Sequence, residues 1–284
     1  MRAYVFPGQG SQSVGMGAEL FDTAPEELAA ADAILGWSVR DLCLRDPEQK
    51  LNQTAWTQPA LYVVNALAFL KGVREKRARP DMVAGHSLGE YNALFAAGAF
   101  DFVTGLRLVQ RRGALMGEAK GGGMAAVIGL TPDRVASVLR SAGLDSIDLA
   151  NLNAPDQCVI SGPASAFDAA EPVFLEAGAQ HFKRLPVSAA FHSRYMKDAA
   201  QEFASYLEDF VLSTPRIPVI SNAEAKPYPA GALKRLLVEQ ITSSVRWSDS
   251  VRYLLAQDNA TIEEVGPGRV LTALVAKVRR AEGR

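Results

Sequence analysis

The fold is decided by one short stretch, Met82-Val83-Ala84-Gly85-His86-Ser87-Leu88-Gly89, and by the helical pattern over residues 90–97 that follows it. Three apolar residues run into a glycine turn, and a helix begins directly behind the turn. Residues 3–6 likewise read as a short apolar strand, which ends at Pro7-Gly8. A strand, a tight turn and a helix in this order predict an α/β architecture with a mainly parallel sheet.

Two longer helices are predicted on either side of this stretch. Residues 60–70 are rich in Ala, Leu and Val on most sides, which is typical of a buried helix. Residues 101–116 form an amphipathic pattern, with Leu106, Val109 and Leu115 along one face. Both helices continue the alternation of strands and helices.

The pattern changes at Gly121-Gly122-Gly123, which we expect to act as a flexible joint. Beyond it the sequence predicts the order β-α-β-β-α-β, the ferredoxin-like arrangement. Thr131 and Pro132 are expected at the N-cap and the first position of its first helix. The expected elements are strand 124–130, helix 131–139, strands 147–152 and 157–161, helix 164–177 and strand 180–186.

The domain organisation follows from this insert. A compact unit whose two ends lie close together can sit inside a larger domain without breaking it. We therefore predict a large discontinuous domain of residues 1–121 and 187–284, and a small domain of residues 122–186. A chain of 284 residues is long enough for both cores.

Composition excludes several classes of protein. Lys and Arg number 30 against 31 Asp and Glu, so no basic surplus is available to neutralise nucleic-acid phosphates. No apolar run reaches the roughly 18–20 residues that cross a bilayer, and the N-terminus lacks a signal peptide's apolar stretch. Cys43 and Cys158 form no C-x-x-C pair and suggest no disulfide framework. We expect a cytoplasmic protein that binds neither nucleic acid nor membrane.

Ser87 is the candidate nucleophile. Residues 85–89 match G-x-S-x-G, in which a strained turn between a strand and a helix exposes the serine hydroxyl. The helix behind Ser87 directs backbone N–H groups and the positive end of its dipole at any oxyanion formed there. The alternative is a glycine-rich turn with a serine N-cap, but the flanking strand and helix favour a nucleophile.

A serine nucleophile needs a base, and the chain has three histidines. His86 is adjacent to Ser87, but neighbouring side chains on a sharp turn point apart, so we expect it to be packed and hydrogen-bonded. His181 lies beside Lys183 and Arg184 in a predicted strand, where a surface position is expected. His192 follows the return of the chain to the large domain and is, by elimination, the best general base.

No Asp or Glu stands out as the group that orients His192. Hydrolases of the α/β type follow the order Ser, acid, His, with the histidine near the C-terminus. His192 is far from the end of this chain, which argues against an ordinary esterase. A backbone carbonyl or an amide side chain could hold the imidazole tautomer instead.

Six spaced motifs resemble those of the malonyl-CoA:acyl carrier protein transacylase family, which includes the fatty-acid enzyme and polyketide synthase acyltransferases. The resemblance runs from about Tyr4 to Val278 and implies an α/β-hydrolase-like large domain with a ferredoxin-like insert. The motifs are Phe6-Pro7-Gly8-Gln9-Gly10-Ser11-Gln12, Thr57-Gln58-Pro59-Ala60, Gly85-His86-Ser87-Leu88-Gly89-Glu90, Arg111-Arg112-Gly113, Phe191-His192-Ser193 and Glu264-Val265-Gly266-Pro267-Gly268.

The resemblance implies catalytic roles for five residues. Ser87 would be acylated by malonyl-CoA and then deacylated by the phosphopantetheine thiol of an acyl carrier protein, in two-step chemistry. His192 would take the serine proton, and the backbone carbonyl of Gln240 would hold its other ring nitrogen. The backbone N–H groups of Gln9 and Leu88 would form the oxyanion hole. The resemblance implies no permanently bound cofactor and no metal ion.

The resemblance also implies the acyl specificity. Arg112, which sequence alone would place on a helix surface, would bind the free carboxylate of malonate through its planar guanidinium. Gln58 and His86 would line the same substrate site. Phe191 suits malonyl, but Ala189 replaces a histidine common in malonyl-selective members, which leaves room for relaxed substrate choice.

Two other functions remain open at this stage. A hydrolase of acyl thioesters would use Ser87 and His192 but transfer the acyl group to water, and a silent docking module would use neither. The compact length favours a freestanding monomer that acts in trans, in fatty-acid or in polyketide synthesis. An acidic carrier would favour a basic rim, with Lys183, Arg184 or Arg279 as candidates.

Overall fold

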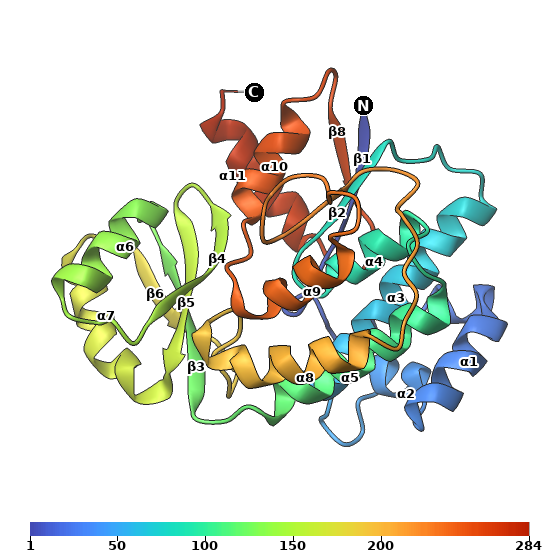
Figure 1. The fold of residues 1–284 in the computed structure, drawn as a ribbon, viewed down its shortest axis with the longest axis horizontal. Helices are drawn as coiled ribbons and strands as arrows, with labels where there is room; N and C mark the ends of the chain where they lie inside the picture. The colour runs from blue at the N-terminus through green and yellow to red at the C-terminus, as the bar shows by residue number, and fades with distance from the viewer. Residues whose placement is uncertain (284) are drawn as a thin grey trace.

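Two separate sheets organise the chain in the structure, a computed structural model that describes residues 1–283 (Figure 1). Sheet A has four strands in the order β7-β2-β1-β8, and every neighbouring pair in it is parallel. The predicted α/β class with a parallel sheet is confirmed. The strands of sheet A are β1 (Arg2–Phe6), β2 (Met82–Gly85), β7 (Val219–Ile220) and β8 (Thr261–Glu264).

Helices cover both faces of sheet A, because side chains alternate between the faces along each strand. Tyr4 and Phe6 pack into the larger core with helices α3 (Thr54–Arg74), α4 (Gly89–Ala96) and α5 (Phe102–Glu118). Ala3 and Val5 pack into a second core against α10 (Trp247–Leu255) and α11 (Val270–Ala281). Around these lie η1 (Phe21–Thr23), α1 (Pro25–Leu35), α2 (Val39–Leu44), η3 (Arg194–Met196), α8 (Lys197–Leu207) and α9 (Leu233–Thr242).

Helix α3 is longer than predicted. The expected helix covered residues 60–70 and so began directly after Pro59. A proline inside a helix removes one backbone donor and crowds the preceding turn. The structure carries the helix through Pro59, and Thr57 to Leu67 are all buried. Burial of this apolar segment therefore outweighs the cost of one proline near the helix start.

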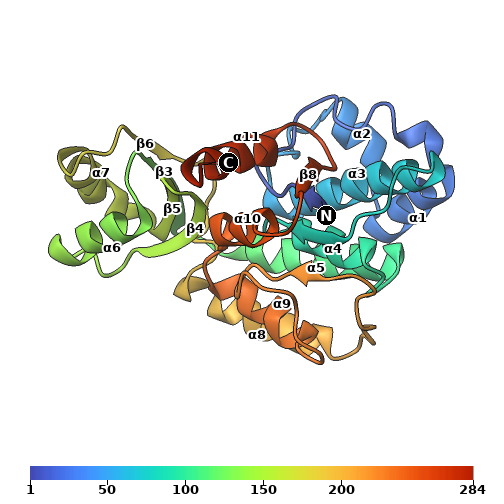
Figure 2. The same cartoon turned by 90° about the horizontal axis from the view of Figure 1, so that it is seen from above.

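The second sheet, sheet B, is antiparallel with strand order β4-β5-β3-β6, and it lies to one side of the parallel sheet (Figure 2). With α6 and α7 it forms the small domain, and its element order confirms the predicted β-α-β-β-α-β arrangement. Thr131 caps α6 as predicted, since its side chain accepts from the backbone N–H of Arg134. The elements are β3 (Gly122–Ile128), α6 (Pro132–Ser141), β4 (Asp148–Ala154), β5 (Gln157–Pro163), η2 (Ala164–Ala166), α7 (Phe167–Glu176) and β6 (His181–Arg184).

The expected flexible joint at Gly121-Gly122-Gly123 is wrong for two of its three residues. Gly122 and Gly123 are paired within β3, and only Gly121 has a positive φ, of 75°. A Cβ on Gly122 would lie 2.3 Å from the backbone nitrogen of Ala190. Gly122 is therefore needed for a close backbone approach to the segment that leads into His192.

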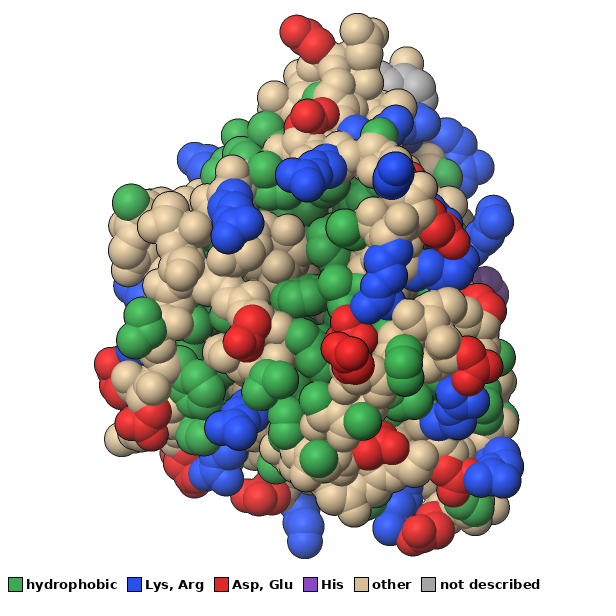
Figure 3. All heavy atoms as spheres, turned by 90° about the vertical axis from the view of Figure 1, so that its right-hand side faces the viewer, with side chains coloured by type: hydrophobic (Ala, Val, Ile, Leu, Met, Phe, Trp, Pro, Cys, Tyr) green, Lys and Arg blue, Asp and Glu red, His purple; other side chains and the backbone are tan. Residues whose placement is uncertain are grey.

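Surface charge is mixed on the face drawn in Figure 3, where basic, acidic and apolar side chains are interspersed. This distribution agrees with the formal net charge of -1. Among the helices of residues 1–283, none has the length and apolar character needed to traverse a bilayer.

Candidate active site

Ser87 sits on a tight turn between β2 and α4, with a φ of 51°. Such a left-handed conformation is strained for a residue with a side chain. A Cβ on Gly85 would lie 1.9 Å from the carbonyl carbon of Gly89, and one on Gly89 would lie 2.0 Å from the carbonyl oxygen of Phe6. Both glycines of the motif are therefore required for the chain to pass through this turn.

Asn222, which sequence reasoning missed, holds the strained turn in place. Its Nδ2 donates to the carbonyl of Gly85 at 2.6 Å, and its Oδ1 accepts from the backbone N–H of Ser87 at 2.7 Å. Asn222 follows β7, the parallel neighbour of β2, so their carboxyl ends meet at the same edge of sheet A. The signal in the sequence was a pair of polar residues, Ser221 and Asn222, after a two-residue strand that is too short to recognise.

Ser87, His192 and Gln240 form a continuous chain of hydrogen bonds. Ser87 Oγ lies 2.7 Å from His192 Nε2, and His192 Nδ1 lies 2.8 Å from the backbone carbonyl oxygen of Gln240. Because a carbonyl only accepts, Nδ1 carries the proton, and Nε2 is free to accept from the serine hydroxyl. Burial, and then the charge of Arg112, lowers the pKa of His192 to about 3, so the imidazole is neutral.

Arg112 is fully buried, which corrects the surface position expected from sequence alone. Its Nη1 donates to Gln58 Oε1 at 2.7 Å, and its Nη2 donates to Ser87 Oγ at 3.0 Å and to Gln240 Oε1 at 2.8 Å. The guanidinium carbon also lies 5.6 Å from the ring centre of Tyr91. The structure thus places a buried cation in direct contact with the candidate nucleophile.

A buried carboxylate, Glu90, lies behind this cation and was also missed by sequence reasoning. Gln240 Nε2 donates to it at 2.6 Å, the backbone N–H of Asn222 donates at 3.2 Å, and the hydroxyl of Tyr228 donates as well. Burial raises the pKa of Glu90 to about 7, although these donors and Arg112 favour its charged form. The side chain of Gln240 therefore links the buried anion to the buried cation.

The space in front of Ser87 is a small cavity of about 90 Å³. It is smaller than the roughly 150 Å³ cavity that accommodates a benzene ring, so it suits a short acyl group. Larger hollows, of about 570, 500 and 430 Å³, lie elsewhere and include neither Ser87 nor His192. Predicted residues that line the small cavity are Gln9, Gln58, His86, Ser87, Leu88, Arg112, Phe191 and His192.

Gln9 and Leu88 approach the serine from two separate loops. A Cβ on Gly8 would lie 2.3 Å from the carbonyl oxygen of His86 and 3.6 Å from the backbone nitrogen of Leu88. Only a glycine lets these two backbones lie so close together. Within residues 1–283, the backbone N–H of neither Gln9 nor Leu88 has a protein acceptor.

His86 points away from the chain of bonds at Ser87. It is partly buried, its Nε2 donates to Asn153 Oδ1 at 2.8 Å, and its ring centre lies 5.6 Å from that of Trp247. Burial lowers the pKa of His86, which agrees with the packed, hydrogen-bonded residue expected from sequence. His181 is exposed, as predicted.

Cys158, a second side chain with a nucleophilic group, lies away from this site. It is buried in the core of the small domain, and burial raises the pKa of its thiol to about 12. No group of three or more candidate metal ligands gathers anywhere in the described part of the chain.

Comparison with known proteins gives one family and many close relatives. The acyl transferase domain family matches residues 3–283. The polyketide biosynthesis malonyl CoA-acyl carrier protein transacylase PksC of Bacillus subtilis is 53% identical over 282 residues, which is 99% of this chain and 98% of that protein. The malonyl CoA-acyl carrier protein transacylase of Escherichia coli is 40% identical, over 97% of this chain and 92% of that protein.

Solved structures agree with this result. A malonyl CoA-acyl carrier protein transacylase from Burkholderia pseudomallei has a TM-score of 0.94 and 48% identity, and the match covers 99% of this chain and 98% of that one. A malonyl-transacylase solved in complex with its type II polyketide synthase acyl-carrier protein has a TM-score of 0.93 and 36% identity, over 98% and 93%.

Proposed function

The chain belongs to the malonyl-CoA:acyl carrier protein transacylase family of acyl transferases, and from this premise we propose how its own residues carry the reaction. It moves a malonyl group from malonyl-CoA to the phosphopantetheine thiol of an acyl carrier protein, through an ester on Ser87. One observation carries the proposal. The same hydroxyl lies 2.7 Å from a neutral imidazole and 3.0 Å from a buried guanidinium.

In the first half-reaction, Ser87 Oγ attacks the thioester carbonyl while His192 Nε2 takes its proton. The carbonyl oxygen becomes an oxyanion, to which the backbone N–H groups of Gln9 and Leu88 donate. When the carbon–sulfur bond breaks, His192 returns the proton to the departing coenzyme A sulfur. The Gln240 carbonyl stabilises the protonated ring between these two transfers.

Arg112 selects acyl groups that carry a carboxylate. A guanidinium presents two parallel N–H donors that match the two oxygens of one carboxylate. Malonyl supplies those oxygens close to the ester bond, whereas acetyl leaves the buried cation without a substrate anion. Gln58, which accepts from Nη1, fixes the plane of the guanidinium.

In the second half-reaction, the carrier's thiol replaces coenzyme A, and His192 takes its proton so that the sulfur attacks the Ser87 ester. The bond between the acyl carbon and Ser87 Oγ then breaks, and His192 returns the proton to the serine oxygen. Hydrolysis by the same Ser–His pair is the competing function. The buried Arg112 favours transfer over hydrolysis. A cation beside the serine binds the carboxylate of the malonyl group and holds the malonyl ester in place until the carrier arrives.

The test is to isolate malonyl-enzyme and measure free malonate with and without phosphopantetheinylated carrier. Transfer predicts little malonate and full loading of the carrier, and equal malonate release in both samples would favour the hydrolase.

We further propose the division of the chain into a large domain of residues 1–121 and 187–284 and a small domain of residues 122–186. We expect a monomer that works on a separate carrier protein, and sedimentation measurements would test the monomeric state. A cytoplasmic location is supported by Cys43 and Cys158, which are both free and buried.

A further inference from the structure

Strand β4 lies at one edge of sheet B, but part of this edge faces the large domain. Asn151 forms a parallel bridge with Val245, where the backbone N–H of Leu152 donates to Val245 at 2.9 Å and that of Val245 donates to Ala150 at 2.8 Å. An exposed edge strand would leave such groups unpaired. The edge of the small domain is thus joined to the large domain by backbone hydrogen bonds.

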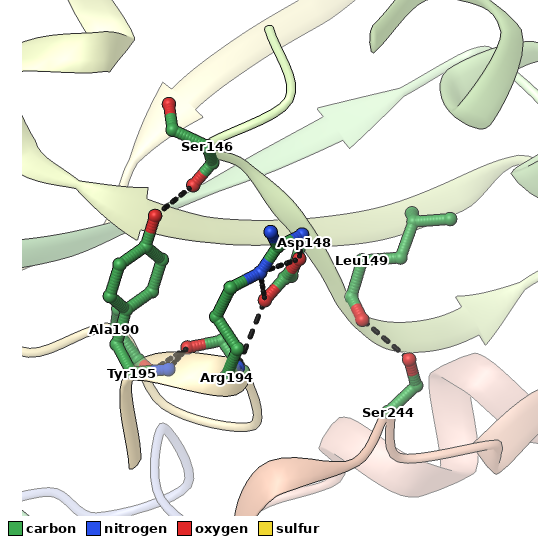
Figure 4. Close-up of polar contacts among 8 residues, drawn as sticks. Ser146, Asp148, Leu149, Ala190, Arg194, Tyr195 and Ser244 are labelled. Carbon is green, nitrogen blue, oxygen red and sulfur yellow. Dashed lines mark hydrogen bonds and ion pairs between the residues drawn. The ribbon is translucent and has the colours of Figure 1, made fainter. Parts of the chain in front are cut away.

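The segment behind His192 is bound to the same strand. The backbone N–H of Arg194 donates to Asp148 Oδ2 at 2.9 Å, its Nε lies 3.0 Å from both carboxylate oxygens, and its Nη2 donates to Oδ1. The hydroxyl of Tyr195 donates to the carbonyl of Ser146 at 2.8 Å. Figure 4 shows the side chain of Arg194 at Asp148, the first residue of β4, and that of Tyr195 at Ser146, just before the strand. Arg194 is only two residues beyond His192, whose own φ is 55°.

The segment behind Gln240 reaches β4 from another direction. Ser244 Oγ donates to the carbonyl of Leu149, as Figure 4 also shows. Gln240 is the residue whose carbonyl holds the His192 ring. At the far end of the strand, Asn153 accepts from His86, the neighbour of Ser87.

We propose that β4 is a clamp that sets the distance between Ser87 and His192, and that Asp148 is its positioning residue. The strand binds the chain next to the nucleophile, next to the base and next to the carbonyl that orients the base. Its pairing with β5 shifts register twice, between Leu149 and Asn151 and between Leu152 and Ala154. Such irregularities redirect side chains and are common beside active sites.

Asp148 is the contact on which the clamp depends most, because it binds Arg194 through both the backbone and the side chain. Its side chain is 19% exposed and that of Arg194 is 61% exposed. An ion pair this exposed adds little to global stability. Its removal should therefore release the His192 segment without unfolding the protein, and small misplacements of a catalytic group slow reactions strongly.

The test uses a reaction that does not depend on malonyl recognition. Methanesulfonyl fluoride, which is small enough for the cavity at Ser87, forms a sulfonyl ester with Ser87 Oγ, releasing fluoride while His192 takes the proton, so its rate reports the Ser–His geometry. Asp148→Ala should slow this labelling by about 10- to 100-fold. The matched control is Asp168→Ala. It removes an exposed ion pair with Arg184 that lies wholly within the small domain, so its labelling rate should stay within about twofold of the wild type.

Malonyl loading provides the second readout and rests on the proposed function. Asp148→Ala should lower its maximal rate by a similar factor with little change in the malonyl-CoA concentration at half-maximal rate, since Arg112 is untouched. Asp148→Asn keeps an acceptor for the Arg194 backbone and should recover part of the loss. Should Asp148→Ala not fold, Asp148→Asn and Arg194→Ala carry the same comparison.

The outcomes separate the two proposals. Wild-type labelling rates in folded Asp148→Ala, or equal losses in Asp148→Ala and Asp168→Ala, would overturn the clamp. Efficient labelling of the wild type without malonyl transfer would overturn the proposed function and leave the clamp to be decided by the labelling rates. A wild-type Ser87 that does not react at all would overturn both.

Discussion

Removing the Arg112 guanidinium should change which acyl group the protein accepts. Arg112→Ala deletes both terminal nitrogens of the guanidinium, of which Nη2 donates to Ser87 Oγ, while Ser87, His192 and the Gln240 carbonyl stay bonded to one another. We therefore expect acyl transfer to persist but malonyl to lose its advantage over acetyl. Acetyl has no carboxylate, so acetyl loading loses no contact with Arg112 in the variant.

The size of the change follows from the contacts that are lost. A hydrogen bond to a charged group contributes about 1.5–3 kcal/mol, so two such bonds to a malonyl carboxylate contribute about 3–6 kcal/mol. Since about 1.4 kcal/mol corresponds to a factor of ten, the ratio of malonyl to acetyl loading should fall by about 10²–10⁴.

The stability of Arg112→Ala also changes, so the assay has to separate a loss of acyl selectivity from a loss of folded protein. Arg112→Ala removes a cation whose charge favours ionised Glu90, and it leaves the buried Oε1 atoms of Gln58 and Gln240 without their donor, which costs about 1–3 kcal/mol of unfolding free energy for each atom. The ratio of two loading rates on the same sample cancels a smaller folded fraction. Arg111→Ala is the matched control, because Arg111 is partly exposed and pairs with Glu202 at 3.0 Å.

The assay follows the mass of the intact enzyme over time after mixing with malonyl-CoA or with acetyl-CoA. Arg111→Ala should keep the wild-type ratio of the two rates within about twofold. Equal loss of malonyl and acetyl loading in Arg112→Ala would show that Arg112 is a structural residue without a role in selection.

Three further predictions concern the base, the turn and the oxyanion donors. Because burial and Arg112 lower the pKa of His192 from 6.5 to about 3, the rate of Ser87 acylation should stay nearly level as pH falls below 6.5 and decline only toward pH 3; a half-maximal rate near pH 6.5 would contradict this. Because of the same pKa shift, His192 binds a proton below pH 6.5 in the unfolded chain but not in the folded chain. The contribution of His192 to stability therefore decreases as pH falls below 6.5. Asn222→Ala leaves the Ser87 N–H and the Gly85 carbonyl without their partner and should lower the unfolding free energy by about 2–4 kcal/mol in denaturant titrations; an unchanged midpoint would argue against a role in holding the turn. Gly8→Ala should slow acylation about 100-fold by separating Gln9 from Leu88, whereas Gly72→Ala, whose Cβ meets only the flexible side chain of Arg77 at 3.2 Å, should not; similar rates in both would remove the proposed oxyanion hole.

Local sequence signals predicted the fold well where a single element carried the information. The glycine turn at Ser87, the Thr131 cap and the order of elements in the small domain all depend on residues close together in the chain, and all appear where expected. The prediction that Gly122 belongs to a flexible joint was wrong for the opposite reason. Its need for glycine comes from Ala190, which is distant in sequence, and not from flexibility.

The residues that surround the site show the same limit. Glu90 lies in an apolar helix, where an acidic residue normally faces solvent, and only the fold brings Tyr228, Asn222 and Gln240 around it. Asp148 begins an edge strand and is unremarkable until Arg194 is placed beside it. The place of Arg112 in the site could be predicted only from the family resemblance, because helical periodicity does not reveal which cation is buried next to a serine.

The most direct measurement locates the malonyl ester. Enzyme loaded with malonyl-CoA is digested and its peptides are mapped by mass, in the wild type and in Ser87→Ala, before and after addition of phosphopantetheinylated carrier protein. The proposed mechanism predicts a malonyl adduct on Ser87 that disappears as an equal amount appears on the carrier, and no adduct in the variant. An adduct that persists in Ser87→Ala, or one that the carrier cannot remove, would contradict it.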